Sequence, residues 1–236
     1  GAAGNATNTP LGTTGSGTSV TSGAVLDLAG FTLGTSEALT LNGSGITNSG
    51  ALMNSGAAAT YSGLITLGSA TRINGGTGTI NISNASTITG SGFTLTLGGA
   101  QGGTLTSILG TLAGGLTIVD GGTWTIAGNN TYTGTTTVTA GTLILNAAGR
   151  IADGSALVVN GTFDMNGFNE TVASLAGAGL VTSAASGTIT LTTSGSTNTT
   201  FSGVIENGSA TSVGLTRSGS GVLTLSGANT YSGTTT

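Results

Sequence analysis

The stretches GGTWTIAGNNTYTGTTT (residues 121–137) and SGVLTLSGANTYSGTTT (residues 220–236) agree at ten of their seventeen positions. The shared positions include an Asn-Thr-Tyr triplet and the closing run of three threonines. Two long stretches of one chain rarely agree in this way by chance, and such self-similarity is typical of proteins built from stacked repeats. The sequence therefore indicates a repeat protein.

Shorter phrases recur in the same order along the chain. These pairs are LDLAGF at 26–31 with FDMNGF at 163–168, TYSGLITLG at 60–68 with TFSGVIENG at 200–208, and AAG at 2–4 with AAG at 147–149. Their offsets of 137, 140 and 145 residues are similar but not constant. Ordered repeats with loop-sized differences in spacing indicate stacked coils of varying length.

Alternation with a period of two dominates between the repeats, and helical periodicity is nearly absent. In GTLILN, Leu143 and Leu145 are expected to point inward while Thr142 and Ile144 point outward. Such runs of four to six residues end at Gly, Ser or Asn, as short strands do. The 46 glycines and the frequent Thr and Ser also disfavour helix.

These patterns predict an all-β fold, a right-handed parallel β-helix (β-solenoid) of roughly a dozen coils, if each coil has about 20 residues. A sandwich or barrel would give no reason for phrases to recur in order. We expect one continuous solenoid over residues 1–236, with two degenerate super-repeats at about 1–137 and 138–236. Inward positions should form apolar columns, and outward positions should form threonine ladders.

The alternation assigns particular side chains to the core and to the surface. Trp124 is in phase with Ile126 and takes the place of a leucine in the other copy, so it should fill the interior rather than stack on a sugar. The two repeated tyrosines should pack at their corners. The expected core residues are Trp124, Ile126, Leu143, Leu145, Leu223 and Leu225, the packed tyrosines are Tyr132 and Tyr231, and the expected surface residues are Asp27 and Asp164.

The stretch GGTWTIAGNNTYTGTTTVTAGTLILNAAG (residues 121–149) resembles the autotransporter-associated β-strand repeat, also called the passenger-associated transport repeat. It follows the pattern G-x-L-T-L-x-G-x-N-T-Y-x-G-x-T-x-V-x-x-G-T-L at nearly every marked position, with Trp124 where Leu is usual. The terminal copy matches from Gly221 to Thr236, and SLAGAG at 174–179 looks like a stretch that follows such motifs. The resemblance implies a right-handed parallel β-helix in large bacterial surface or secreted proteins, exported to the cell exterior, and it implies no single activity.

The charge balance argues against several classes of partner and cofactor. The chain has three arginines, no lysine, seven carboxylates and a net charge of −4. Three scattered cations cannot neutralise a run of phosphates, so we expect no nucleic-acid binding. Anionic lipid surfaces are disfavoured for the same reason, and no apolar run is long enough for a membrane helix. The absence of His and Cys argues against a zinc site.

The seven carboxylates offer no obvious acid–base pair, and we expect no catalytic, cofactor-binding or metal-binding residues and no enzyme activity. Asp27 and Asp164 hold the same place in a repeated phrase, which favours turn chemistry over catalysis. Glu170 follows Asp164 by six residues and could approach it across a bend. The remaining carboxylates are Glu37, Asp120, Asp153 and Glu206.

The leading hypothesis is a structural, extracellular rod or filament segment on the bacterial cell surface. Adhesion to glycans or cells is the alternative, and ice binding by threonine ladders or polysaccharide degradation is less favoured. The chain starts without Met and stops where the internal copy continues with VTAGTLIL, so we expect a window from a longer repetitive protein. Neither end looks like a cap, and head-to-tail stacking with other coils is expected.

Overall fold

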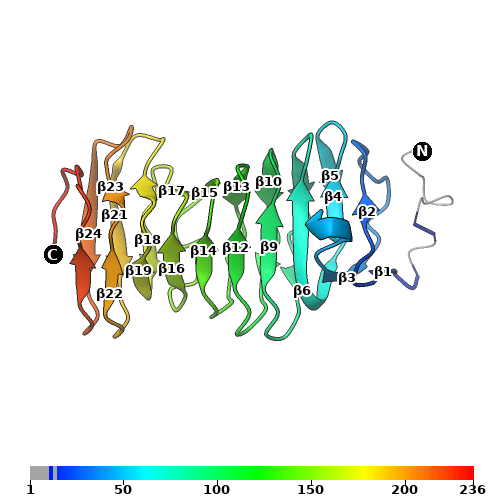
Figure 1. Ribbon diagram of the computed structural model, residues 1–236, viewed down its shortest axis with the longest axis horizontal. Helices are drawn as coiled ribbons and strands as arrows, with labels where there is room; N and C mark the ends of the chain where they lie inside the picture. The colour runs from blue at the N-terminus through cyan, green and yellow to red at the C-terminus, as the bar shows by residue number, and fades with distance from the viewer. Residues whose placement is uncertain (1–10, 13–14) are drawn as a thin grey trace.

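A computed structural model describes residues 11–12 and 15–236 as an elongated stack of β-coils with about ten turns. The coils follow one another along a single axis, and the C-terminal coil lies at the end opposite to β1 (Figure 1). The fold is the all-β parallel solenoid that the repeats predict, with essentially no helix. The phrase AAG at 2–4 and the residue Gly1 lie outside the described residues.

The strands line up into sheets that run along the stack, and every strand pair is parallel. The ten-stranded sheet contains β1 (Thr18–Val20), β2 (Leu26–Asp27), β3 (Leu39–Gly43), β4 (Leu52–Asn54), β6 (Ile65–Gly75), β9 (Leu95–Gly98), β12 (Leu116–Ile118), β14 (Thr136–Val138), β16 (Ala156–Val159) and β19 (Ser174–Ala176). The eight-stranded sheet contains β5 (Ala59–Tyr61), β7 (Ile80–Ile82), β10 (Gly102–Leu105), β13 (Thr123–Ile126), β15 (Thr142–Leu145), β17 (Thr162–Asp164), β20 (Leu180–Thr182) and β23 (Val204–Ile205).

Smaller sheets complete the coils. They contain β8 (Thr87–Ile88) with β11 (Ile108–Leu109), β18 (Glu170–Val172) with β21 (Thr188–Thr193) and β24 (Ser212–Arg217), and β22 (Thr199–Phe201) with β25 (Leu223–Leu225). Within the described residues one short 3-10 helix, η1 (Ile46–Asn48), interrupts the strands.

The length of a coil can be read from the register of paired strands. Trp124 pairs with Leu143, 19 residues further on, whereas Leu41 pairs with Leu67, 26 residues further on. The coils are thus uneven, as the varying offsets of the repeats predict. Coils longer than the expected 20 residues account for a stack of about ten turns rather than a dozen.

The core is a single column of aliphatic and aromatic side chains that runs the length of the stack. Trp124, Ile126, Leu143 and Leu145 are fully buried, which confirms the inward phase of these strands. The prediction was too strong for Leu223 and Leu225, which are only partly buried. Their strand, β25, pairs with β22 alone among the described strands, so one side of it is uncovered.

Threonine does form outward columns, but they are short. Along the eight-stranded sheet, one such column runs through Thr60, Asn81, Thr104 and Thr125 and continues through Ile144 and Asp164. A flat, regular threonine array is therefore absent from this column. The division into two super-repeats at about residue 137 stays a prediction.

Candidate functional site

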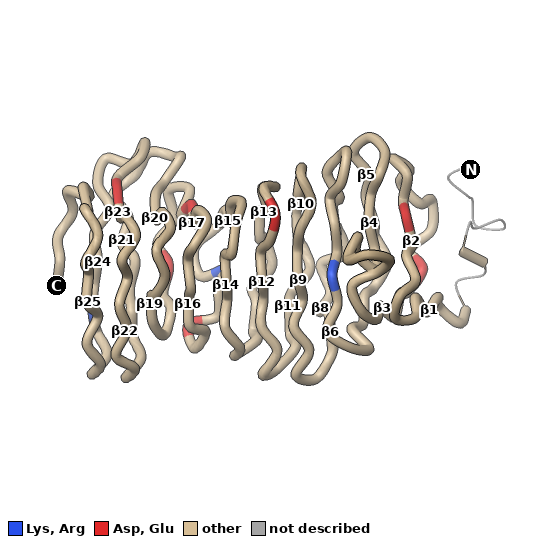
Figure 2. Tube along the Cα trace, viewed as in Figure 1, with Lys and Arg blue, Asp and Glu red and all other residues tan. Residues whose placement is uncertain are grey.

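The carboxylates are spread along the stack and do not converge on one site (Figure 2). Within the described residues, no group of three or more Asp, Glu, His or Cys side chains lies close enough to hold a metal ion. None of the described helices is long and apolar enough to cross a membrane. The role of each carboxylate therefore follows from its own contacts.

Asp27 and Asp164 make the same pair of backbone contacts. Asp27 Oδ1 accepts hydrogen bonds from the N–H of Ala29, two residues on, and from the N–H of Ser55 in the next coil, both at 2.9 Å. The Ser55 hydroxyl also donates to Asp27 Oδ2 at 2.5 Å. Burial alone would raise the pKa of Asp27, but the hydrogen bonds from Ser55 and Ala29 outweigh it and hold the pKa below its usual value.

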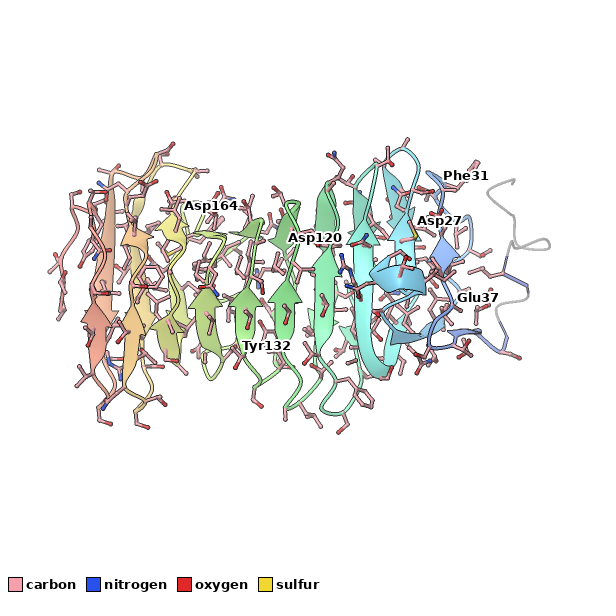
Figure 3. All side chains as sticks on the ribbon, in the orientation of Figure 1. Asp27, Phe31, Glu37, Asp120, Tyr132 and Asp164 are labelled. Carbon is pink, nitrogen blue, oxygen red and sulfur yellow. The ribbon has the colours of Figure 1, made fainter. Side chains whose placement is uncertain are left out.

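Asp164 repeats this arrangement further along the stack (Figure 3). Its Oδ1 accepts from the N–H of Asn166 at 2.8 Å and from the N–H of Ala184, in the next coil, at 2.9 Å. Asn166 and Ala29, the equivalent residues of the two phrases, both adopt left-handed backbone, with φ of 47° and 49°. The repeated aspartate therefore closes a tight turn and ties that turn to the following coil.

The expected surface position is correct for Asp27 and wrong for Asp164. Asp27 is exposed, whereas the Asp164 side chain is buried. The difference comes from the neighbours, because β17 lies between β15 and β20, whereas β2 pairs only with β4 among the described strands. The same sequence phrase is buried in the middle of the stack and exposed to solvent near the end of the stack.

Glu170 is buried, and its hydrogen bonds are made with backbone N–H groups rather than with Asp164. Its carboxylate instead accepts hydrogen bonds from the N–H of Arg150, in the preceding coil, at 2.9 Å and from its own neighbour Thr171 at 3.3 Å. Burial raises the pKa of Glu170 to about 7, although these N–H groups pull it downward. A buried carboxylate of this kind holds the loop that contains Arg150.

The Asn-Thr-Tyr motif is a corner that joins successive coils. Asn130 Oδ1 accepts from the N–H of Leu109 at 2.7 Å, and Asn130 Nδ2 donates to the carbonyl of Arg150 at 2.7 Å, so the side chain bridges the coils on both sides. In the second copy, Asn229 accepts from the N–H of Ile205 in the same way, at 2.8 Å. The motif is thus a structural corner in both places.

Each tyrosine of this motif bonds the threonine four residues further on. The Tyr132 and Thr136 hydroxyls lie 2.5 Å apart, and the Tyr231 and Thr235 hydroxyls lie 2.8 Å apart. Tyr132 is fully buried, as predicted, and burial raises the pKa of its hydroxyl above its usual value (Figure 3). Tyr231 is only partly buried, because it lies in the terminal coil.

Trp124 occupies the interior, which agrees with its predicted role as a core residue. It is fully buried, and its Nε1–H donates to the carbonyl of Gly98 at 3.1 Å. A sugar could not reach this ring. The one tryptophan of the chain therefore contributes to packing and satisfies its polar atom within the stack.

One polar constellation was not anticipated from the sequence. The guanidinium of Arg72 forms an ion pair with Asp120, which lies 48 residues further on, and also donates to Asn74 Oδ1 at 3.0 Å. Nothing in the local sequence marks the pair, because the contact depends on how the intervening coils stack. Arg217 instead donates to three backbone carbonyls, those of Thr193, Gly195 and Gly221.

Comparisons with known proteins agree with the architecture. Residues 116–145 and 215–236 match the family model of the passenger-associated-transport-repeat. The chain is also 34% identical over 172 residues to the adhesin BmaC autotransporter of Brucella suis biovar 1 (strain 1330). No solved structure matches the chain.

The match to the adhesin covers 70% of this chain but 4% of the adhesin, so the chain spans a small part of the length of this curated relative. The two matched repeats contain the two Asn-Thr-Tyr corners and the strands β12, β13, β14 and β15. The β-solenoid described above is therefore a passenger-like fold, and the chain contains two passenger-associated-transport-repeats.

Proposed function

We propose that this chain is a rigid, non-enzymatic segment of a bacterial adhesin that acts at the cell surface or outside the cell. The observation that carries the proposal is the use of its polar residues. Asp27, Asp164 and Asn130 each bond the backbone of a neighbouring coil. Side chains that stabilise the stack in this way are suited to a mechanical role rather than to acid–base chemistry.

Rigidity follows from the continuous parallel ladders. With a rise of about 4.8 Å for each coil, about ten turns give a rod of about 50 Å. Each coil in the middle of the stack is bonded to two others, as β13 is to β10 and β15. Because it has no hinge, such a segment keeps a fixed length and can hold other parts of a larger protein away from the cell.

The adhesin relative supports both the location at the cell surface and the role in attachment that we propose. It is described as an adhesin and an autotransporter, and the match extends over most of this chain. The low charge and the absence of cysteine are compatible with an exported protein. By this proposal, the segment contributes to attachment as a spacer with an accessible outer wall.

The proposal can be tested on intact bacteria that produce the parent protein. An antibody raised against this chain should label cells without permeabilisation, and in-frame deletion of residues 18–236 should lower attachment to host cells. Purified chain should release no reducing ends from a panel of polysaccharides. Labelling that requires permeabilised cells, or polysaccharide cleavage by the purified chain, would contradict the proposal.

Association with further coils is a second candidate function, and the terminal coil favours it. Leu223 and Leu225 are partly buried and Val222 is 60% exposed, whereas the equivalent Trp124 and Ile126 are fully buried beneath β15. An apolar edge strand of this kind readily pairs with another strand. A strand like β15, either from further coils of one longer polypeptide or from a second copy of the chain, would complete the coil.

Sedimentation over a range of protein concentrations tests this second candidate. The chain should associate into linear oligomers, because a head-to-tail contact does not close on itself. Val222→Lys should reduce association, since an edge lysine opposes strand pairing. A monomer at all concentrations, or association that Val222→Lys leaves unchanged, would contradict it.

A further inference from the structure

One loop projects from the otherwise regular outer surface of the stack. Between β3 and β6, Leu41 pairs with Leu67 but Gly43 pairs with Thr71, so β6 carries extra residues at a bulge. Directly after Gly43, the chain leaves the sheet in a loop that contains η1, and the coiled ribbon of this helix lies on the outside of the stack near β4 and β6 (Figure 1). The loop and the bulge together shape a groove in the wall.

The loop is held in a fixed shape. The N–H of Gly50 donates to the carbonyl of Ser44 at 2.7 Å and closes the neck of the loop. Thr47 and Asn48 adopt left-handed backbone, with φ of 46° and 69°. Two adjacent residues with side chains in this region cost conformational energy, and such strain is common where a loop presents groups to a ligand.

The groove below the loop has a volume of about 400 Å³, which lies within the range of small-molecule sites, about 300–1,000 Å³. Its lining combines polar side chains with a larger apolar surface. The side chains that line it include Ser44, Asn48, Thr71, Arg72, Thr96 and Val119. The groove thus offers hydroxyl, amide and guanidinium groups beside an apolar methyl surface.

The ion pair at its edge provides a donor and an acceptor side by side. Arg72 Nη2 contacts Asp120 Oδ2, and the latter also accepts from the N–H of Gly99 at 2.7 Å. Within the described chain, Arg72 Nη1 and Asp120 Oδ1 make no hydrogen bond. The Asp120 side chain is 41% exposed and lies toward solvent on the outer wall (Figure 3).

From this arrangement we infer that the groove between the η1 loop and β6 binds a neutral saccharide unit. One sugar hydroxyl would donate to Asp120 Oδ1 while its neighbour accepts from Arg72 Nη1, and the apolar face of the ring would lie on Val119. Asn48 and Ser44 would bond further hydroxyls from the loop side. The inference rests on the proposed adhesin role and names the site through which the rod would contact glycans.

The charges favour a neutral ligand over an acidic one. The single positive charge of Arg72 is already balanced by Asp120, and the chain as a whole carries a net charge of −4. An acidic sugar would have to displace Asp120 from the guanidinium. A hydroxyl-rich neutral unit uses both groups without separating them.

The arginine side chains themselves provide the measurement. The chain has three arginines and no lysine, so an NMR spectrum of the arginine Nε–Hε groups contains three signals. Lactose, maltotriose, mannotriose and N-acetyllactosamine serve as neutral probes, and sialyllactose serves as the acidic probe. The Arg72 signal should shift in a saturable way with at least one neutral probe, while the signals of Arg150 and Arg217 stay in place.

Matched variants locate the ligand. Asn48→Gly removes the amide without adding strain to the left-handed backbone, and it should weaken binding by at least about tenfold, which corresponds to about 1.4 kcal/mol. Asp120→Asn should weaken it similarly, since it removes the charged acceptor. Asn146→Gly, at an exposed asparagine away from the groove, should leave binding unchanged.

Three results would overturn the inference: no shift of the Arg72 signal with any neutral probe, a shift with sialyllactose alone, or equal binding by Asn48→Gly and the parent chain. These results are distinct from failure of the adhesin role. If deletion of residues 18–236 lowers attachment but the Arg72 signal stays in place, the rod contributes to adhesion without this glycan site.

Discussion

Asp164 accepts a hydrogen bond from the N–H of Ala184 at 2.9 Å, and this bond joins one coil of the solenoid to the next. The same oxygen accepts from the N–H of Asn166, so one carboxylate satisfies a turn and an inter-coil contact. Asp27 does the same for Ala29 and Ser55. A phrase repeated in the sequence therefore corresponds to a repeated link between coils.

Replacing Asp164 by alanine should destabilise its coil, because two partly buried N–H groups lose their acceptor. We expect a total cost of about 1–3 kcal/mol. Hydrogen exchange should become faster at the amides of Asn166 and Ala184. Asp27→Ala serves as the matched control and should cost less, since Asp27 is exposed and water can replace it. Equal effects of the two substitutions would contradict this explanation.

Close packing requires a glycine at Gly203, two residues after the buried side chain of Phe201. At Gly203, an added Cβ would lie 1.9 Å from the carbonyl oxygen of Gly179 and 2.6 Å from Phe201 Cζ. Gly203→Ala should therefore lower the free energy of unfolding by about 1–3 kcal/mol or more. Gly154→Ala is the control, because nothing lies within 4 Å of its added Cβ. Urea denaturation of both variants measures the difference, and two equal midpoints would count against the packing argument.

The fold could be predicted from the sequence because its signals are local and repeated. Alternation with a period of two placed Trp124 and Leu143 in the core, and the structure pairs these two residues in adjacent strands. The ordered repeats excluded architectures in which strands do not stack in sequence order. Both inferences need only the spacing of residues within one or two coils.

The polar groove could not be predicted in the same way. Arg72 and Asp120 meet because the coils between them stack in one particular register, and coil length varies along the chain. The burial of Asp164 also depends on the neighbouring coils, since the equivalent Asp27 is exposed. Contacts between coils of unequal length are not encoded in any local pattern.

Core leucines in the middle and at the end of the stack should differ in their sensitivity to substitution. Leu143 is fully buried between Trp124 and Phe163, so Leu143→Ala should cost about 2–5 kcal/mol. Leu225→Ala should cost clearly less, because Leu225 is partly buried in an edge strand. Hydrogen exchange, which resolves individual coils, provides the measurement. A larger loss at Leu225 than at Leu143 would show that the end coil is more tightly covered than the structure indicates.

Glu170 should make stability depend on pH near neutrality. Its folded-state pKa of about 7 lies above the usual 4.5, so the folded state favours the protonated carboxyl. The contribution of this proton to stability is complete below pH 4.5 and is lost as the pH rises through 7. The total change is on the order of 3 kcal/mol, since one pKa unit corresponds to about 1.4 kcal/mol.

The variant Glu170→Gln isolates this effect, because glutamine keeps the acceptor for the Arg150 N–H but does not titrate. Urea denaturation between pH 4.5 and 7.5 should show the parent chain losing stability relative to Glu170→Gln as the pH rises. Glu206→Gln is a suitable control, since its carboxylate accepts only from the Thr182 hydroxyl within the described chain, at 3.1 Å. If the stability difference between the parent chain and Glu170→Gln is the same at every pH, Glu170 is already ionised throughout this range and its burial does not control its charge.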